Sequence, residues 1–159
     1  MPLSNIARPE DWFNALPPLL AMQTYQAAVT KGEIPQPGDK TIFVCPSAKG
    51  WSGSNFLSYG QNIYLSPWIR PAPHRMGEIS LPSALAFLAD GPGTHSSVCP
   101  SSMAYSVPSR HDRQAVIAFL DAHVEAFPGA YLGCGTGDPK RSDVRWETGT
   151  PGVNQAPLP

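Results

Sequence analysis

Three polar residues at the two ends of one apolar segment are the strongest candidates for chemistry in this chain: His111, Asp121 and His123. Two imidazoles and a carboxylate can ligate a metal such as zinc or act as a general base. They can also be structural, because an aspartate at a turn accepts backbone amide protons and a histidine entering a strand can hydrogen-bond at the sheet edge. We favour the structural interpretation and keep catalysis by these three residues as the alternative.

A second candidate is the glycine-rich stretch of residues 131–144. Its glycines allow carbonyl groups to turn inward, and Asp138 and Asp143 carry the hard oxygen atoms that calcium prefers. Two basic residues lie between these acids and there is no EF-hand loop, so a solvated turn is the competing interpretation. Calcium, with Asp138, Asp143 and Asp121 as candidate ligands, is the cofactor that the sequence suggests.

Motifs for other chemistries are missing from the sequence. It contains neither a Gly-x-Ser-x-Gly nucleophile elbow nor a His-Glu-x-x-His zinc motif. An enzymatic function therefore depends on a metal-activated water that attacks an ester or lactone carbonyl.

The first candidate group is positioned by a predicted β-hairpin. Two apolar runs rich in Val, Ile and Phe, residues 115–120 and 122–127, meet at Asp121-Ala122. A tight hairpin turn favours a residue that accepts positive φ, which is costly for the Cβ of Ala122. We therefore expect a turn of a longer or different type.

The segment from His111 to Ala122 resembles the H-X9-DG signature of prepilin-type proteins, the family of type II secretion pseudopilins and type IV pilins. Here the signature is His111, nine residues and Asp121-Ala122, with alanine in place of the usual glycine. Residues 43–47 and 58–65 resemble two further segments of the family, in the same order along the chain. The resemblance covers roughly residues 9–147.

This resemblance implies an α+β fold, a pilin-like head in which an N-terminal helix packs on a small antiparallel sheet with long loops. The implied function is structural, as a subunit of a secretion or pilus system in the periplasm or at the cell surface, with other pilin or pseudopilin subunits as partners. Some pseudopilins fix a loop near the C-terminal end with calcium, which agrees with the second candidate site. The alternative is a small calcium- or zinc-dependent hydrolase of esters or lactones on the same scaffold.

Periodicity places the remaining elements. Residues 19–29 predict a helix without internal glycine or proline, and 41–45 and 57–65 predict strands. Residues 84–91 resemble 117–122, so we expect two strands of one sheet, each ending at an aspartate. If these strands are antiparallel the two acids lie at opposite ends, and if parallel they share an edge. Residues 144–146 predict a final strand or loop.

Length and composition bound the possible functions. A chain of 159 residues suits one domain, residues 1–159, with flexible tails expected at 1–8 and 148–159. The formal net charge of −1 provides no field that attracts nucleic acid or an anionic membrane. No apolar run of about 18 residues occurs, so no membrane span is expected. The sequence therefore predicts a soluble head without the pilin stalk, which was either removed or never encoded.

The three cysteines, Cys45, Cys99 and Cys134, are too few and too irregularly spaced for a zinc cage built from cysteine pairs. The extracytoplasmic location that the resemblance implies permits one disulfide. Cys45 and Cys99 are the candidate pair, because each is followed by Pro-Ser. The sequence does not determine the pairing. Buried or loop thiols without a catalytic role are the preferred interpretation.

Overall fold

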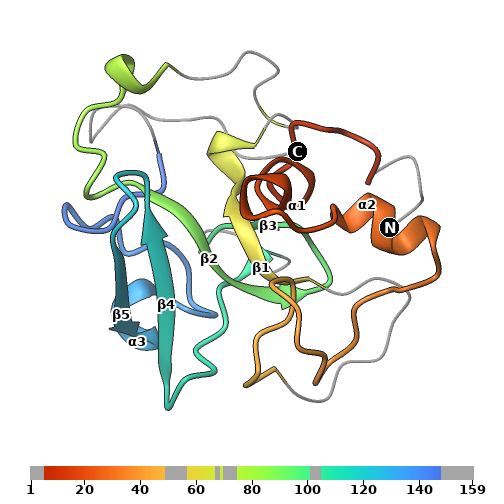
Figure 1. The fold of residues 1–159 in the computed structure, drawn as a ribbon. Helices are drawn as coiled ribbons and strands as arrows, with labels where there is room; N and C mark the ends of the chain where they lie inside the picture. The colour runs from red at the N-terminus through yellow and green to blue at the C-terminus, as the bar shows by residue number, and fades with distance from the viewer. Residues whose placement is uncertain (1–5, 49–56, 67–68, 70–74, 101–104, 148–159) are drawn as a thin grey trace.

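The computed structural model describes residues 6–48, 57–66, 69, 75–100 and 105–147. A five-stranded sheet in the order β3-β1-β2-β4-β5 forms its centre (Figure 1). The strands are β1 (Leu57–Asn62), β2 (Ala86–Gly93), β3 (Ser97–Val98), β4 (Gln114–Phe119) and β5 (Val124–Pro128). The helices are α1 (Trp12–Ala15), α2 (Tyr25–Thr30) and α3 (Gly129–Leu132), with 3-10 turns η2 (Pro17–Leu20), η3 (Ile63–Leu65) and η4 (Met76–Glu78). The fold is thus mixed α/β with few and short helices.

The hairpin prediction is confirmed. β4 and β5 pair antiparallel with Ala115 opposite Phe127 and Ile117 opposite Glu125. The Phe119 amide donates to the His123 carbonyl, so residues 120–122 form a three-residue loop. In this loop the Ala122 amide donates to the Phe119 carbonyl, and Ala122 has φ +75°. Three-residue hairpin loops commonly end in a left-handed residue. The turn is thus longer than two residues, as expected, but Ala122 adopts the positive φ that it was expected to avoid.

The expected pairing of the two similar strands is also confirmed. β2 lies beside β4 and runs antiparallel to it, with Ala89 opposite Ile117. Of the two arrangements left open by the sequence, the antiparallel one is therefore correct. Asp90 and Asp121 lie at opposite ends of this pair of strands.

The sheet is mixed and not purely antiparallel, which corrects the expected pilin-like sheet. β3 runs parallel to β1, with Gln61 opposite Ser97 and Asn62 opposite Val98. The segment at residues 144–146 contributes an isolated parallel bridge between Leu85 and Arg145. Local periodicity carries no information about which distant segments pair, so these parallel pairs could not be predicted from the sequence.

The prediction of one continuous helix over residues 19–29 is wrong, because the structure has two short helices there. η2 ends at Leu20, the next residue Ala21 adopts a left-handed conformation with φ +54°, and α2 begins only at Tyr25. Thr24 starts this second helix as its N-cap, because its Oγ1 accepts the Ala27 amide at 3.1 Å. A threonine at that position favours a helix start over a helix interior.

The strand predicted over residues 41–45 is likewise wrong, since this segment forms turns. Thr41 causes the difference, because its Oγ1 accepts the Phe43 amide and its carbonyl accepts the Val44 amide. A threonine side chain that bonds nearby backbone competes with strand pairing. The β-prone side chains of Phe43 and Val44 are buried nevertheless.

Two apolar clusters cover opposite faces of the sheet. Neighbouring residues of a strand point to opposite faces, and on β2 Leu88 packs with one cluster and Ala89 with the other. The first cluster includes Ile117, Leu132 and Trp146, and the second is formed by residues of α1, α2, β1 and the turn at 41–45. Figure 1 shows α3 beside β4 and β5, away from α1 and α2.

The predicted tails fall largely outside the described residues. Residues 1–5 and 148–159 are not described, whereas Ile6 is buried in the second apolar cluster. Within the described part of the chain, no helix has the length and apolar character needed to cross a bilayer.

Candidate metal centre

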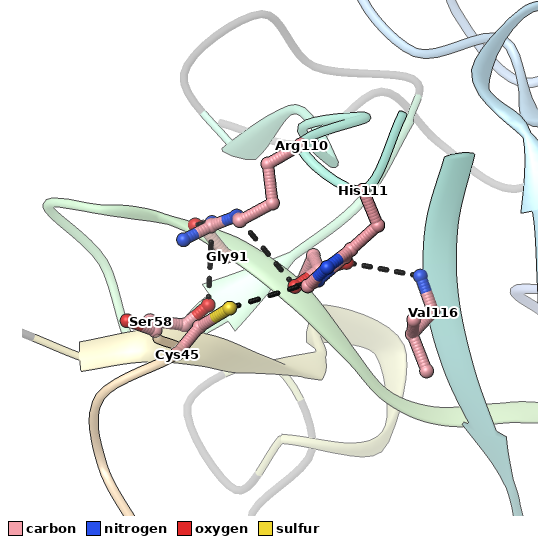
Figure 2. A network of polar contacts seen from close by, with 7 residues as sticks. Cys45, Ser58, Gly91, Arg110, His111 and Val116 are labelled. Atoms are coloured by element: carbon pink, nitrogen blue, oxygen red, sulfur yellow. Dashed lines mark hydrogen bonds and ion pairs between the residues drawn. The ribbon is translucent and has the colours of Figure 1, made fainter. Parts of the chain in front are cut away.

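Three potential ligands of different chemistry meet at the end of the β1–β2 pair: Cys45, Asp90 and His111, here called the interior cluster. Their ligand atoms all lie within 4.8 Å of one another. His111 Nε2 is 3.6 Å from Cys45 Sγ and 3.3 Å from Asp90 Oδ1 (Figure 2). A thiol, a carboxylate and an imidazole thus face one common centre.

Asp90 is supplied by β2 and is fully buried, with none of its side chain exposed. Its Oδ2 accepts the Val116 amide of β4 at 2.9 Å, just beyond the last paired residues of the two strands. The carboxylate therefore replaces a carbonyl where β2 and β4 separate. This bond holds one oxygen and leaves Oδ1 directed at His111.

His111 stands before β4 at the start of a two-residue turn that it closes by exchanging backbone hydrogen bonds with Gln114. The turn residues Asp112 and Arg113 both have positive φ, at +52° and +62°. Such a turn matches the twist of paired strands but is disfavoured for residues with a Cβ. This constrained turn sets the position of the imidazole, which is 30% exposed.

Cys45 comes from the turn that ends at residue 45, and it is buried. That turn is fixed to β1, because the Ser58 amide donates to the Phe43 carbonyl at 2.8 Å, and the Cys45 carbonyl accepts the Ala48 amide. Backbone hydrogen bonds before and after Cys45 therefore fix the position of its backbone, and with it the thiol.

Arg110 supplies a positive charge beside the cluster. Its Nε lies 3.6 Å from Asp90 Oδ1, and a terminal nitrogen donates to the carbonyls of Ser58 and Gly91 (Figure 2). The pairing of β1 with β2 is irregular between Leu57 and Tyr59, which leaves these carbonyls to the guanidinium.

A glycine is required at residue 91, because β1 and β2 approach closely there. A Cβ on Gly91 would lie 2.8 Å from the Tyr59 carbonyl carbon and 3.0 Å from the Gly60 nitrogen. Such distances are well inside van der Waals contact. The absence of a side chain at residue 91 therefore permits the strand geometry that presents its carbonyl to Arg110.

Tyr59 completes the surroundings. It pairs with Asp90 across β1 and β2, so both side chains lie on the same face of the sheet. Burial raises the pKa of the Tyr59 hydroxyl, and negative charge on Cys45 and Asp90 raises it further. The side-chain interaction of Tyr59 with Cys45 raises this pKa as well, so the Tyr59 hydroxyl keeps its proton.

The cluster does not have the arrangement of a nucleophilic triad. In a triad one imidazole nitrogen takes the proton of the nucleophile while the other nitrogen is oriented by the carboxylate. Here the same atom, His111 Nε2, faces both Cys45 and Asp90. An unprotonated nitrogen between a sulfur and a carboxylate oxygen is repelled by both. The neutral tautomer with the proton on Nε2 avoids this repulsion by donating to Asp90 Oδ1, and a metal ion at the centre would avoid it as well.

Asp121 and His123 also lie close together, at the tip of the β4–β5 hairpin. His123 Nδ1 is 2.6 Å from Asp121 Oδ1, and the same oxygen accepts the His123 amide at 3.2 Å. This pair, here called the tip pair, is separated from His111 by the length of β4. The structure thus brings two of the three residues of the first candidate group together and places His111 with Cys45 and Asp90 instead.

Asp138 and Asp143 are both engaged in local bonds. Asp138 accepts the Lys140 amide at 2.8 Å, while Asp143 accepts the Tyr131 hydroxyl and pairs with Arg141 at 3.2 Å. The hydrogen bond from Tyr131 holds the pKa of the Asp143 carboxyl below its usual range. Among the described residues, neither these acids nor Asp121 belongs to a group of three possible metal ligands.

Cys45 and Asp90 were not expected as site residues from the sequence. Asp90 did carry a signal, since it is an acid at the end of an apolar run that must be buried. Cys45 carried none, because it approaches His111 across 66 residues. Neither Cys45 nor Cys99 is part of a disulfide in the described structure.

Comparisons with known proteins give no family assignment. No family model, curated protein or solved structure matches this chain.

Proposed function

We propose that this chain binds a divalent transition metal ion, zinc in the first instance, through Cys45, Asp90 and His111. The observation that carries the proposal is the convergence of their three ligand atoms within 4.8 Å. A metal ion in this position would take the place of a proton on His111 Nε2, between the sulfur and the carboxylate oxygen.

The ligand set favours zinc over calcium. Calcium takes oxygen ligands, whereas zinc accepts thiolate, imidazole and carboxylate together. The Val116 amide that holds Asp90 Oδ2 is the kind of outer partner that orients a ligating carboxylate. Calcium at Asp138 and Asp143 remains a prediction, for which their local hydrogen bonds give no support.

The role that we propose for the metal is structural. The three ligands come from three separate segments, namely the turn before β1, strand β2 and the turn before β4. An ion bound to all three stabilises the folded chain, because the unfolded chain does not present the ligands together.

Calorimetric titration of the reduced chain tests this proposal. Zinc should bind in a one-to-one ratio, and calcium should not compete. Cys45→Ser should weaken zinc binding by more than the about 10–100-fold that loss of an outer partner costs. Cys134→Ser is the matched control, since Cys134 lies outside the ligand group, and it should leave the affinity unchanged. Equal zinc affinity of the two variants would exclude the interior cluster as the site.

We keep the pilin-like structural subunit as a second proposal for the wider role. The specific observation that supports it is the φ of +75° at Ala122, the position where the H-X9-DG signature carries glycine. Location outside the cytoplasm and assembly with other pilin or pseudopilin subunits belong to this proposal. A metal that only stabilises the fold is compatible with it.

The alternative is a metal-dependent hydrolase of esters or lactones. A screen with chromogenic ester and lactone substrates, run on the zinc-loaded chain and after chelation, separates the two roles. A structural subunit should give no turnover that depends on the metal. Turnover that is lost on chelation and in Cys45→Ser would replace the structural role by the catalytic one.

A further inference from the structure

The charges around the interior cluster do not balance once a metal is bound. A divalent ion carries two positive charges, which the Cys45 thiolate and the Asp90 carboxylate neutralise. The guanidinium of Arg110 then remains, with its side chain only 14% exposed. A positive charge that is mostly withdrawn from water attracts a compensating anion.

The ligand count also leaves one position open. Zinc is usually four-coordinate in proteins, and sites with three protein ligands bind an outside ligand in the fourth position. No fourth histidine, cysteine, aspartate or glutamate in the described part of the chain joins Cys45, Asp90 and His111. His111 is the most exposed of the three, so access from solvent lies on its side.

Arg110 has an unused donor at this place. Its Nε is buried without a hydrogen-bond acceptor, because Asp90 Oδ1 at 3.6 Å is too distant for a hydrogen bond. Coordination of Asp90 Oδ1 to a metal would draw that oxygen's charge away from the guanidinium. The Nε–H group, 3.6 Å from that oxygen, then lacks an anionic partner.

We propose that the metal-loaded interior cluster binds a small monocarboxylate, with one carboxylate oxygen on the metal and the other accepting a hydrogen bond from Arg110. This inference rests on the proposed metal binding. A carboxylate has the single negative charge that balances the site, and its two oxygens match a metal and a guanidinium side by side. A neutral ligand would leave the charge of Arg110 uncompensated.

Cobalt(II) loading followed by titration with acetate tests the proposal, because the visible bands of cobalt report its coordination sphere. Acetate should produce a saturable spectral change. Acetamide, a neutral molecule of the same shape, and sodium chloride at equal ionic strength should not. A spectrum that acetate leaves unchanged, or that acetamide changes equally, would overturn carboxylate binding.

Arg110 variants sharpen the test. Arg110→Gln should weaken acetate binding by about tenfold or more, as expected for loss of one charged hydrogen bond. Arg110→Lys keeps the charge and should lose less. If Arg110→Gln does not fold, Arg110→Lys still tests the hydrogen bond. Lysine keeps the charge but lacks the planar donor group of arginine, so Arg110→Lys should bind acetate more weakly than the unaltered chain, and an unchanged acetate affinity would exclude the hydrogen bond from Arg110.

The two proposals fail in different ways. If cobalt does not bind, the metal centre itself is wrong. If cobalt binds through Cys45, as its sulfur charge-transfer band shows, and acetate has no effect, only the carboxylate proposal is wrong.

Discussion

Two histidine–aspartate pairs in the described part of the chain differ in burial far more than in composition. In the tip pair His123 and Asp121 are 2.6 Å apart and are 41% and 38% exposed. In the interior cluster His111 and Asp90 are 3.3 Å apart, and the carboxylate is fully buried. The pair with the longer distance is the one that we expect to matter more for stability and binding.

Exposure to solvent explains why the pair with the shorter distance is expected to contribute less. Water and salt screen the attraction between exposed charges, so such pairs contribute little however short they are. A buried carboxylate has lost its hydration and depends on its protein partners, so removing one partner is costly. The same two residue types are therefore a local turn contact in one place and a candidate ligand set in the other.

The largest contrast should appear when each carboxylate is removed. Asp90→Ala should lower the free energy of unfolding by about 3–5 kcal/mol, because the buried charge of Arg110 and the Val116 amide lose their partner. Asp121→Ala should cause a much smaller fall in melting temperature. Urea denaturation in the presence of a chelator measures both, and equal losses would contradict the role that we assign to burial.

The interior cluster can also be disturbed without removing a charge. Gly91→Ala should destabilise the chain by about 1–3 kcal/mol, because the new Cβ meets the β1 backbone at 2.8 Å and displaces the carbonyl that Arg110 binds. Gly77→Ala is the control, since nothing lies within 4 Å of a Cβ there. Thermal denaturation that shows no difference between the variants would mean that the two strands separate without cost.

The tip of the hairpin should respond in the opposite direction. Ala122→Gly should raise the free energy of unfolding by about 1 kcal/mol, because glycine adopts φ +75° without strain. Ala126→Gly, on the exposed strand β5, should lower it instead. A loss of stability in Ala122→Gly would indicate that the alanine is unstrained in this turn.

The smallest effect concerns pH at the tip pair. The hydrogen bond from His123 lowers the pKa of the Asp121 carboxyl. A lowered folded-state pKa stabilises the fold above the unfolded-state pKa, and this contribution disappears as pH falls through the lowered value. A carboxyl titration by NMR should give a midpoint below that of an ordinary aspartate, and His123→Ala should move it upward. An unchanged midpoint would remove the hydrogen bond as the cause.

Local patterns were sufficient to predict the hairpin and its neighbour. The apolar runs on either side of Asp121-Ala122 predicted β4 and β5. The similarity of 84–91 to 117–122 predicted two strands of one sheet, which are neighbours in the structure. Alternation and turn chemistry act over a few residues, so they can be recognised in one sequence. The turn is longer than two residues, as expected, although Ala122 adopts the positive φ that the sequence argument expected it to avoid.

Contacts that depend on topology or on single capping residues could not be predicted in this way. The helix over 19–29 was interrupted by Ala21 and by the N-cap Thr24, although the apolar content favoured a continuous helix. Cys45 meets Asp90 and His111 only because the turn before β1 is fixed beside the β1–β2 pair. No spacing along the chain encodes that meeting, so the sequence predicted partners of His111 only at nearby residues.

The separation of 66 residues between Cys45 and His111 has a kinetic consequence. The β4–β5 hairpin closes over a few residues and can form within microseconds, whereas docking of the Cys45 turn requires closure of a much longer loop. An interaction made after the transition state slows unfolding and leaves the folding rate nearly unchanged. A metal ion that binds the interior cluster after the transition state would lengthen the lifetime of the folded chain and leave its folding rate nearly unchanged.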